Sequence, residues 1–488
     1  MDRRILTLAA SVAIALTGSA KVKLPHLISD GMVIQQNSEV RLWGWAEPGH
    51  EVTVSPSWEG QGPVSAKADG EGRWSVSVKS PAASFTPLSI TFSEAAAPGR
   101  GQKPSKRVSD EVTVSDVLAG EVWVCAGQSN MEMPVKGFGN CPVENYNLEV
   151  INAADGIRSV KIPSVMSMQP LDDAPCQWRA SSPQTIPDFS ATGYFFAKTM
   201  RRALNIPIGL IEANKGGSRV ESWLDREYLS RHTDEPLDSN AMVRKYSWDY
   251  HRPLLWGNGT FHPILNYTIR GILYYQGCSN VGDPAGRYTQ RLSDLAAQWR
   301  RDFRQGDVPF YFVQIAPYYY DDANADWGAR LREQQWNATK VIPNSAMVCT
   351  NDCVYPYETQ QIHPAQKQKV GQRLAFLALN KTYGMKQIIC DSPTFKSMDI
   401  KGDTVFVQLD HLADGISRYE DIQGFEMCGA DRVYHKANAY YYWTKGIILT
   451  CPEVKQPVNI RYCFRNFQVG NVANQGGLPL VPFRTDDY

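Results

Sequence analysis

The stretch Val122-Trp123-Val124-Cys125-Ala126-Gly127-Gln128-Ser129-Asn130-Met131-Glu132-Met133 decides the fold of this chain. Its first five residues are apolar and predict a buried strand, and the polar residues that follow mark the end of that strand. Open α/β sheets bind ligands at the carboxyl ends of their strands, which is where this pattern places the Ser129 hydroxyl. Ser129 is therefore a candidate nucleophile. The competing interpretation is a serine that caps the next helix, so the rest of the chain has to decide.

The apolar strand pattern recurs through residues 118–385, where it alternates with helical patterns. Such alternation predicts a mainly parallel sheet flanked by helices. Residues 136–188 interrupt it with a long, irregular, proline-rich insertion, and insertions at strand ends often build substrate walls. The predicted strands are 122–126, 208–213, 271–275, 309–316 and 346–349, and the predicted helices are 190–204, 288–303, 329–340 and 364–379.

Strand patterns without helices lie on both sides of this region. In residues 21–117, runs such as 39–45 and 73–78 alternate polar and apolar side chains and are separated by glycine-containing turns. This part is predicted to be an N-terminal β-sandwich domain. Strand signals such as 404–409 return in residues 386–488, which predicts a C-terminal β domain.

The N-terminus has the features of a signal peptide. Arg3 and Arg4 precede an apolar run that ends in small residues, which fits cleavage after Ala20. Residues 1–20 therefore predict export, to the periplasm or outside the cell. No later segment has the length and apolarity of a membrane span, so we expect no membrane insertion.

Composition excludes several classes of protein. The 488 residues include 50 basic and 50 acidic side chains, so no nucleic-acid partner is expected. Ten cysteines in a chain of this length do not make a disulfide scaffold, and their pairing is not readable from the sequence. The chain contains neither a His-Glu-x-x-His motif nor a paired Cys-x-x-Cys motif, so we expect no metal and no cofactor.

The chain contains eight histidines, the residue type that most often acts as the base for a serine nucleophile. His363 follows the last predicted strand, and Pro364 fits the first position of the final helix. The loops gather over the sheet at that point, so His363 can reach Ser129. His262 stands just before a strand and is predicted to be structural.

Two further stretches supply hydrogen-bond donors for an oxyanion. Gly216 and Gly217 follow the second strand, and a glycine pair lets the backbone N–H approach a ligand closely. Gln276 and Asn280 follow the third strand, and either side-chain amide can donate to the same oxygen. Each signal is weak alone, but all lie at carboxyl ends of predicted strands.

These blocks together resemble the SGNH hydrolase superfamily and, within it, the sialate O-acetylesterases. The resemblance extends into both flanking regions and covers nearly the whole mature chain. It implies an SGNH-type, flavodoxin-like parallel sheet. The segments that carry it are Gly127-Gln128-Ser129-Asn130-Met131, Gly216-Gly217-Ser218 with Trp223, Tyr275-Gln276-Gly277 through Ser279-Asn280, Ile362-His363-Pro364 with Lys367 and Arg373, Trp43-Gly44-Trp45 and Gly424-Phe425-Glu426.

Two departures from the family pattern leave the acid partner of the histidine open. Cys278 stands where the family commonly has Glu, and Gln360 stands where the superfamily often has Asp. The nearby carboxylates are Asp352 and Glu358. A third option is a Ser–His pair whose imidazole is oriented by a backbone carbonyl. Of the three, Asp352 is preferred.

The resemblance implies hydrolysis of sugar acetyl esters with release of acetate. Ser129 would attack the carbonyl and His363 would take its proton. The oxyanion would face the N–H of Ser129, the N–H of Gly217 or Gly216, and the side chain of Gln276 or Asn280.

The implied substrate is O-acetylated sialic acid, whose carboxylate Arg219 could meet. The alternatives are an acetylesterase for other glycans, such as acetylxylan, and a non-catalytic glycan-binding protein. The acetylated hydroxyl position and the oligomeric state are not determined by the sequence.

Overall fold

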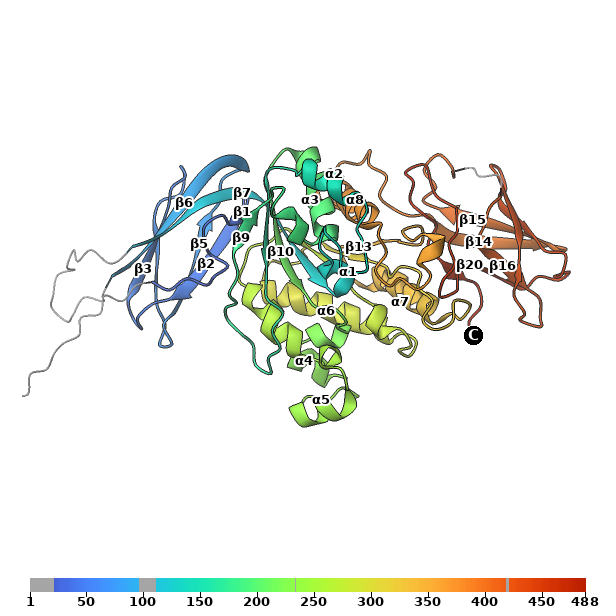
Figure 1. Cartoon of the computed structure of the whole chain (residues 1–488), viewed down its shortest axis with the longest axis horizontal. Helices are drawn as coiled ribbons and strands as arrows, with labels where there is room; N and C mark the ends of the chain where they lie inside the picture. The colour runs from blue at the N-terminus through green and yellow to red at the C-terminus, as the bar shows by residue number, and fades with distance from the viewer. Residues whose placement is uncertain (1–21, 96–110, 233, 418–420) are drawn as a thin grey trace, which may run out of the picture.

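The computed structural model describes residues 22–95, 111–232, 234–417 and 421–488. The predicted signal peptide, residues 1–20, lies outside the described residues. Three regions follow one another along the long axis of the molecule: a β region, a central α/β region and a second β region (Figure 1). No helix among the described residues combines the length and apolarity needed to cross a membrane.

The central region is built on a mainly parallel sheet. All neighbouring strands run parallel except β9, which is antiparallel to β8. Without β8 and β9, the strands stand in the order 2-1-3-4-5, which is the flavodoxin-like order. The predicted fold class is confirmed. In spatial order the strands are β13 (Ser345–Val348), β12 (Phe310–Val313), β11 (Gly271–Tyr275), β7 (Val112–Gly127), β10 (Ile208–Asn214), β8 (Ile157–Lys161) and β9 (Trp178–Ala180).

Strands β8 and β9 correct the prediction for the 136–188 insertion, which was expected to be irregular. β8 pairs with β10 and extends the sheet, although Arg158 and Ser159 separate its two apolar residues and leave no continuous apolar run. A helix, α2 (Tyr146–Ile151), precedes these strands. The insertion therefore forms one edge of the sheet as well as loops above it.

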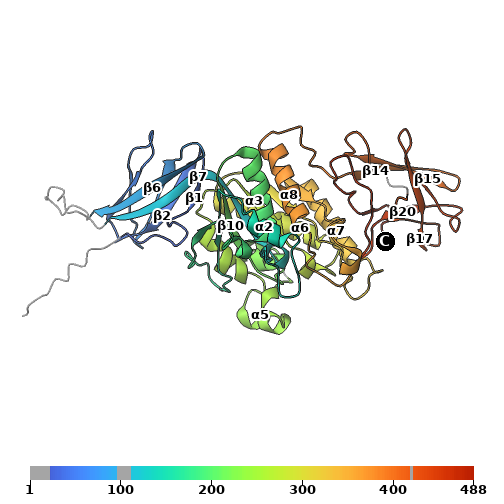
Figure 2. The same cartoon turned by 45° about the horizontal axis from the view of Figure 1, so that its top comes forward.

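Each face of the sheet is covered by two helices. Along β7, Val122 and Val124 point into one apolar core, and Trp123 and Cys125 point into the other. The period of two in a strand causes this alternation. Helices α6 (Arg287–Phe303) and α7 (Trp327–Val341) cover the first face. Helices α3 (Ala191–Leu204) and α8 (Lys367–Leu377) cover the second face and lie side by side (Figure 2).

Helix α8 begins three residues later than predicted. Pro364 does not start it, because the N–H of Ala365 donates to Glu358 Oε1 at 3.0 Å and the segment turns before Lys367. His363 therefore lies in a loop held by side chains, not at a helix N-terminus.

Strand β7 joins the central sheet to the N-terminal β region. Its first half pairs with β1 (Val33–Gln35) and β6 (Ser84–Ala95), and its second half pairs with β10 and β11. The sheet continues through β3 (Glu51–Pro56) and β4 (Val64–Lys67), and β2 (Glu39–Trp45) pairs with β5 (Arg73–Lys79).

The C-terminal β region consists of two four-stranded sheets around one apolar core. The first is β14 (Thr394–Lys401), β15 (Thr404–Asp410), β19 (Gly446–Thr450) and β18 (Asn438–Tyr442). The second is β17 (His435–Lys436), β16 (Phe425–Cys428), β20 (Asn459–Tyr462) and β21 (Phe483–Arg484). The remaining α-helices are short: α1 (Ser129–Glu132), α4 (Arg226–Ser230) and α5 (Ser239–Lys245), of which α5 projects from the central region (Figure 1).

Candidate active site

Ser129 is placed by the abrupt end of β7. Gly127 has a φ of +136°, and a Cβ there would lie 2.2 Å from the carbonyl oxygen of Tyr275 on β11. Only glycine allows this approach. The side chain of Gln128 then accepts the N–H of Gly277 at 2.8 Å. These contacts turn the chain, and Ser129 begins α1 as a partly exposed residue that is not the N-cap.

His363 reaches Ser129 from the loop between β13 and α8. Its Nε2 lies 2.7 Å from Ser129 Oγ. Asn130 Nδ2 donates to the carbonyl oxygen of Ile362 at 3.0 Å and ties this loop to α1. With Nδ1 protonated, Nε2 can accept the serine proton, which is the geometry that a general base requires.

The imidazole of His363 is neutral at pH 7. Burial is the main cause that lowers its pKa to about 4, and the ammonium of Lys367 contributes in the same direction. Lys367 is itself fully buried, which lowers its own pKa to about 8. Its Nζ donates to the carbonyl oxygen of Pro364.

The structure does not bring Asp352 to His363, so its predicted role as the acid partner has to be corrected. Arg373 binds both oxygens of Asp352, at 2.6 and 2.7 Å, and also donates to the carbonyl oxygen of Gly477 at 3.1 Å. Burial raises the pKa of Asp352, but the hydrogen bonds from Arg373 outweigh it and the net pKa is lowered. Asp352 therefore anchors α8 and the C-terminal segment.

Glu358, the other candidate acid, is also engaged elsewhere. It accepts the N–H of Tyr355 at 2.8 Å and that of Ala365 at 3.0 Å. Cys278, which occupies the position where a glutamate was expected, is a thiol whose pKa burial raises to about 11. Within the described ranges, no carboxylate makes a hydrogen bond or ion pair with His363.

The turn after β10 lies against Ser129. A Cβ on Gly216 would be 3.5 Å from Ser129 Cβ, and the N–H of Gly216 donates to Glu132 Oε2 at 2.6 Å. Gly217 has a φ of +74°, and its N–H has no acceptor among the described residues. The N–H groups of Ser129 and Gly217 have no acceptor among the described residues and are thus available to a ligand, as an oxyanion site requires.

The comparisons with known proteins agree with this geometry. Residues 119–380, more than half of the chain, match the family described as carbohydrate esterases, sialic acid-specific acetylesterases. The chain belongs to this family. It is 26% identical to the human sialate O-acetylesterase over 437 residues, which cover 83% of this chain and 79% of the human protein. The mouse sialate O-acetylesterase is also 26% identical, over 461 residues, with coverages of 83% and 82%.

A solved structure gives the same result. The crystal structure of a carbohydrate acetylesterase from Xanthomonas citri superimposes with a TM-score of 0.82 at 30% sequence identity. The match covers 96% of this chain and 100% of that one. The protein is thus a carboxylic ester hydrolase that acts on acetylated sugars.

In this carbohydrate esterase, Gln276 and Asn280 do not have free amide donors, contrary to prediction. Gln276 Nε2 donates to the carbonyl oxygen of Ser218 at 3.0 Å and to Asn280 Oδ1 at 2.8 Å. Asn280 Nδ2 donates to Glu221 at 3.0 Å and to Asp283 at 2.8 Å. Both side chains are buried and hold the turn after β10 in place.

Arg219 is also committed to contacts within the esterase. It forms a bidentate pair with Asp283 at 3.0 and 3.1 Å and donates to the Tyr246 hydroxyl at 2.8 Å. Only 8% of the residue is exposed. The predicted role in binding a substrate carboxylate is therefore not supported, because Asp283 and the buried acids Glu221 and Glu235 already balance the charge of the guanidinium.

Sequence analysis missed the residues that contact His363 from the insertion. Cys141 Sγ lies 3.8 Å from His363 Nδ1, and the Phe138 ring packs edge-on against the imidazole with centroids 5.2 Å apart. All ten cysteines are free thiols, Cys141 included. No motif marks these positions, because their proximity to His363 is created only by the fold.

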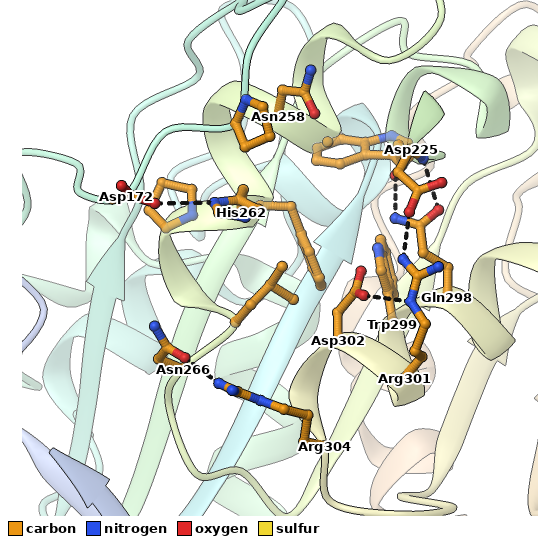
Figure 3. A pocket seen from close by; sticks show the side chains of 16 residues that line it. Asp172, Asp225, Asn258, His262, Asn266, Gln298, Trp299, Arg301, Asp302 and Arg304 are labelled. Carbon is orange, nitrogen blue, oxygen red and sulfur yellow. Dashed lines mark hydrogen bonds and ion pairs between the residues drawn. The ribbon is translucent and has the colours of Figure 1, made fainter. Parts of the chain in front are cut away.

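The cavity shown in Figure 3 is a separate feature of the esterase. It has a volume of about 430 Å³, and neither Ser129 nor His363 lines it. His262, predicted to be structural, lies in its wall and bonds through Nδ1 to the carbonyl oxygen of Leu171 at 2.8 Å. Asp225 and Asp302 lie on the opposite side of the cavity and pair with Arg301 (Figure 3).

Proposed function

We propose that the protein is a serine esterase that removes O-acetyl groups from sialic acid, with Ser129 as nucleophile and His363 as general base. The observation that carries the proposal is the 2.7 Å contact between Ser129 Oγ and His363 Nε2. A neutral imidazole beside a serine hydroxyl is competent to accept its proton near pH 7.

The reaction proceeds in two halves. His363 takes the Ser129 proton as Oγ attacks the acetyl carbonyl, and the oxyanion accepts hydrogen bonds from the N–H groups of Ser129 and Gly217. The C–O bond to the sugar breaks, and the proton on His363 goes to the departing sugar oxygen. Water then attacks the acetyl-enzyme and gives its proton to His363. Collapse of this second intermediate releases acetate and returns the proton to Ser129.

Aromatic side chains near the site support a sugar substrate. The Tyr250 ring lies over Gly217, where an added Cβ would be 2.5 Å from Tyr250 Cδ2. Trp248 stacks on Tyr250 with ring centroids 5.6 Å apart and is 60% exposed. Exposed aromatic faces of this kind can stack against sugar rings.

The choice of sialic acid rests on the family and on the curated human and mouse relatives. A second candidate is an acetylated neutral glycan such as acetylxylan. It is favoured by the engagement of Arg219 with Asp283, which leaves that cation unable to meet a sialic acid carboxylate. Acetate release should be compared on O-acetylated sialic acid and on acetylxylan. A higher kcat/KM on acetylxylan would reject sialic acid.

The serine mechanism is tested with an acetylated aryl ester. Ser129→Ala should lower kcat by at least about 10⁴-fold. Ser239→Ala, which changes an exposed serine on α5, is the matched control and should keep the wild-type rate. Equal rates for wild type and Ser129→Ala would reject the nucleophile, and glycan binding without turnover by wild type would favour a binding protein.

Export of the mature chain is a separate proposal. It is supported by the charged and apolar pattern of residues 1–20. N-terminal sequencing of the protein from its natural host should begin at Lys21, and a mature chain that retains Met1 would contradict the proposal.

A further inference from the structure

The surroundings of His363 Nδ1 differ from those of a catalytic triad. If Nε2 accepts the serine proton, Nδ1 carries a hydrogen and needs an acceptor. The group that faces Nδ1 is the sulfur of Cys141, at 3.8 Å. Cys141 is only 3% exposed, so water does not readily replace this contact.

The hydrogen of the Cys141 thiol has acceptors of its own. Gln361 Oε1 lies 3.2 Å from Sγ, and Asn140 Oδ1 lies 3.3 Å from it. Gln361 Oε1 also accepts the backbone N–H of His363 at 3.2 Å. The thiol hydrogen therefore points away from the imidazole, and the sulfur lone pairs are left to accept the Nδ1 hydrogen.

The position of Cys141 is fixed by a tight turn at the start of the insertion. Phe138 and Cys141 exchange two backbone hydrogen bonds, at 3.0 and 3.1 Å. Gly137 has a φ of +74°, and a Cβ there would lie 2.2 Å from the carbonyl oxygen of Cys141. The same turn places the Phe138 ring against His363 at an interplanar angle of 73°. Two side chains of one turn thus hold the imidazole.

We propose that Cys141, supported by Gln361, is the positioning residue that holds His363 with Nδ1 protonated, in the place where a triad would have a carboxylate. The proposal rests on the proposed function of Ser129 and His363. It also assigns a role to the start of the 136–188 insertion, which supplies the support of the base.

A neutral partner has an electrostatic consequence. A carboxylate at Nδ1 would stabilise the imidazolium and raise the pKa of His363, whereas a thiol does not. The charged group that acts on His363 is Lys367 of α8, and burial with this cation keeps the pKa of His363 at about 4. Burial lowers the pKa of Lys367, and four nearby groups act in the opposite direction. These groups are Glu358 and the thiols of Cys141, Cys278 and Cys353.

The test uses the full-length enzyme and an acetylated aryl ester as substrate. Cys141→Ala removes the acceptor and should lower kcat by about tenfold with KM unchanged, because proton transfer is affected and binding is not. Cys141→Ser keeps an acceptor and a donor and should retain kcat within about threefold of wild type. Cys390→Ala, which changes another buried thiol, is the matched control and should match wild type.

Cys141→Asp provides a second measurement, the pH dependence of kcat/KM, which would not change if Cys141 only supported the fold. The new carboxylate should raise the acid limb of the kcat/KM profile by about one pH unit or more. The proposal is overturned if Cys141→Ala retains wild-type kcat, or if folded Cys141→Asp leaves the acid limb unmoved. Thermal unfolding of each variant shows whether it is folded. If Cys141→Asp does not fold, the comparison of Cys141→Ala with Cys141→Ser tests the proposal.

Failure of this proposal is distinguishable from failure of the proposed function. If Ser129→Ala keeps its activity, the nucleophile is wrong and the Cys141 variants have no bearing on catalysis. If Ser129→Ala is inactive and Cys141→Ala is fully active, only the positioning role is wrong.

Discussion

Ser129 Oγ and His363 Nε2 lie 2.7 Å apart, but the serine follows a strand of the sheet and the histidine lies in a loop. The serine follows the central strand of the sheet, and its position is set by backbone atoms. Gly127 lies close against the carbonyl oxygen of Tyr275 on β11, and the N–H of Gln128 donates to that oxygen at 2.9 Å. The histidine lies in a loop whose position is set by side chains from distant parts of the chain. Among these are Asn130 and Cys141, and Glu358 of the same loop adds a hydrogen bond to Ala365.

The difference predicts that the serine side and the histidine side of the site tolerate substitutions to different degrees. A strand end fixed by backbone atoms cannot adjust when a methyl group is added, because neighbouring carbonyl groups do not move independently. A loop fixed by side chains can lose one contact and keep the others. Substitutions on the serine side should therefore cost stability and activity together, whereas those on the histidine side should separate the two.

The largest effect is expected for the base itself. His363→Ala should lower kcat by about 10⁴-fold or more while the enzyme stays folded, because the imidazole does chemistry and carries little of the loop's support. Steady-state kinetics and thermal unfolding should be measured together. A His363→Ala enzyme with kcat within tenfold of wild type would show that the histidine side contains another base.

Gly127→Ala tests the rigidity of the serine side. The new Cβ would meet the Tyr275 carbonyl oxygen at 2.2 Å in a backbone conformation that other residues rarely adopt. We expect the free energy of unfolding to fall by about 4 kcal/mol, with loss of activity. Urea denaturation measures the first effect. Gly62→Ala is the control, because nothing lies within 4 Å of a Cβ there; equal stabilities of the two variants would refute a rigid strand end.

Asp352→Asn separates anchoring from catalysis. It leaves Arg373 buried without a counterion, and the free energy of unfolding should fall by about 3 kcal/mol. The kcat of the folded enzyme should stay within about tenfold of wild type, because Asp352 does not contact His363. Asp391→Asn, at an exposed ion pair with Lys381, is the control and should cost less than about 1 kcal/mol. A kcat loss as large as that of His363→Ala, with stability unchanged, would restore Asp352 as the acid.

The smallest expected effect is on the pH dependence of kcat/KM. The pKa of His363 is lowered to about 4, so the deprotonated form that acts as the base predominates above that pH. The kcat/KM profile should fall on the acid side near pH 4, and the rate at pH 5.5 should be close to the plateau. A histidine of ordinary pKa would be mostly protonated at pH 5.5, with an about tenfold lower rate. A midpoint near 6.5 would contradict the buried, carboxylate-free environment.

Most of the α/β framework could be predicted because its signal is local. Every predicted strand of residues 118–385 is present, since each is a short apolar run bounded by polar residues. The sequence gives no strand signal for β8, because only Ile157 and Val160 of its five residues are apolar, and its pairing with β10 becomes visible only in the sheet. The start of α8 was placed too early because Glu358 captures the N–H of Ala365.

The incorrect predictions for three side chains of the site have a common physical cause. The sequence predicts that Gln276, Asn280 and Arg219 bind the substrate or the oxyanion, because each follows a strand end and carries N–H donors. Their donors are used instead by carboxylates and carbonyl groups of the protein. Arg219 pairs with Asp283, Gln276 donates to the carbonyl oxygen of Ser218, and Asn280 donates to Asp283. A sequence shows which groups can donate, but it does not show which acceptors the fold has already supplied.

The sequence by itself determined the mainly parallel sheet, the strand-end position of Ser129 and the selection of His363 as its partner, because strand periodicity and glycine-containing turns act over a few residues. The tertiary structure alone decided what stands behind the histidine. Asp352 pairs with Arg373, and Cys141, more than 200 positions away in the chain, lies against Nδ1 of His363. Such partners are selected by packing and by competition among buried charges, which no local pattern records.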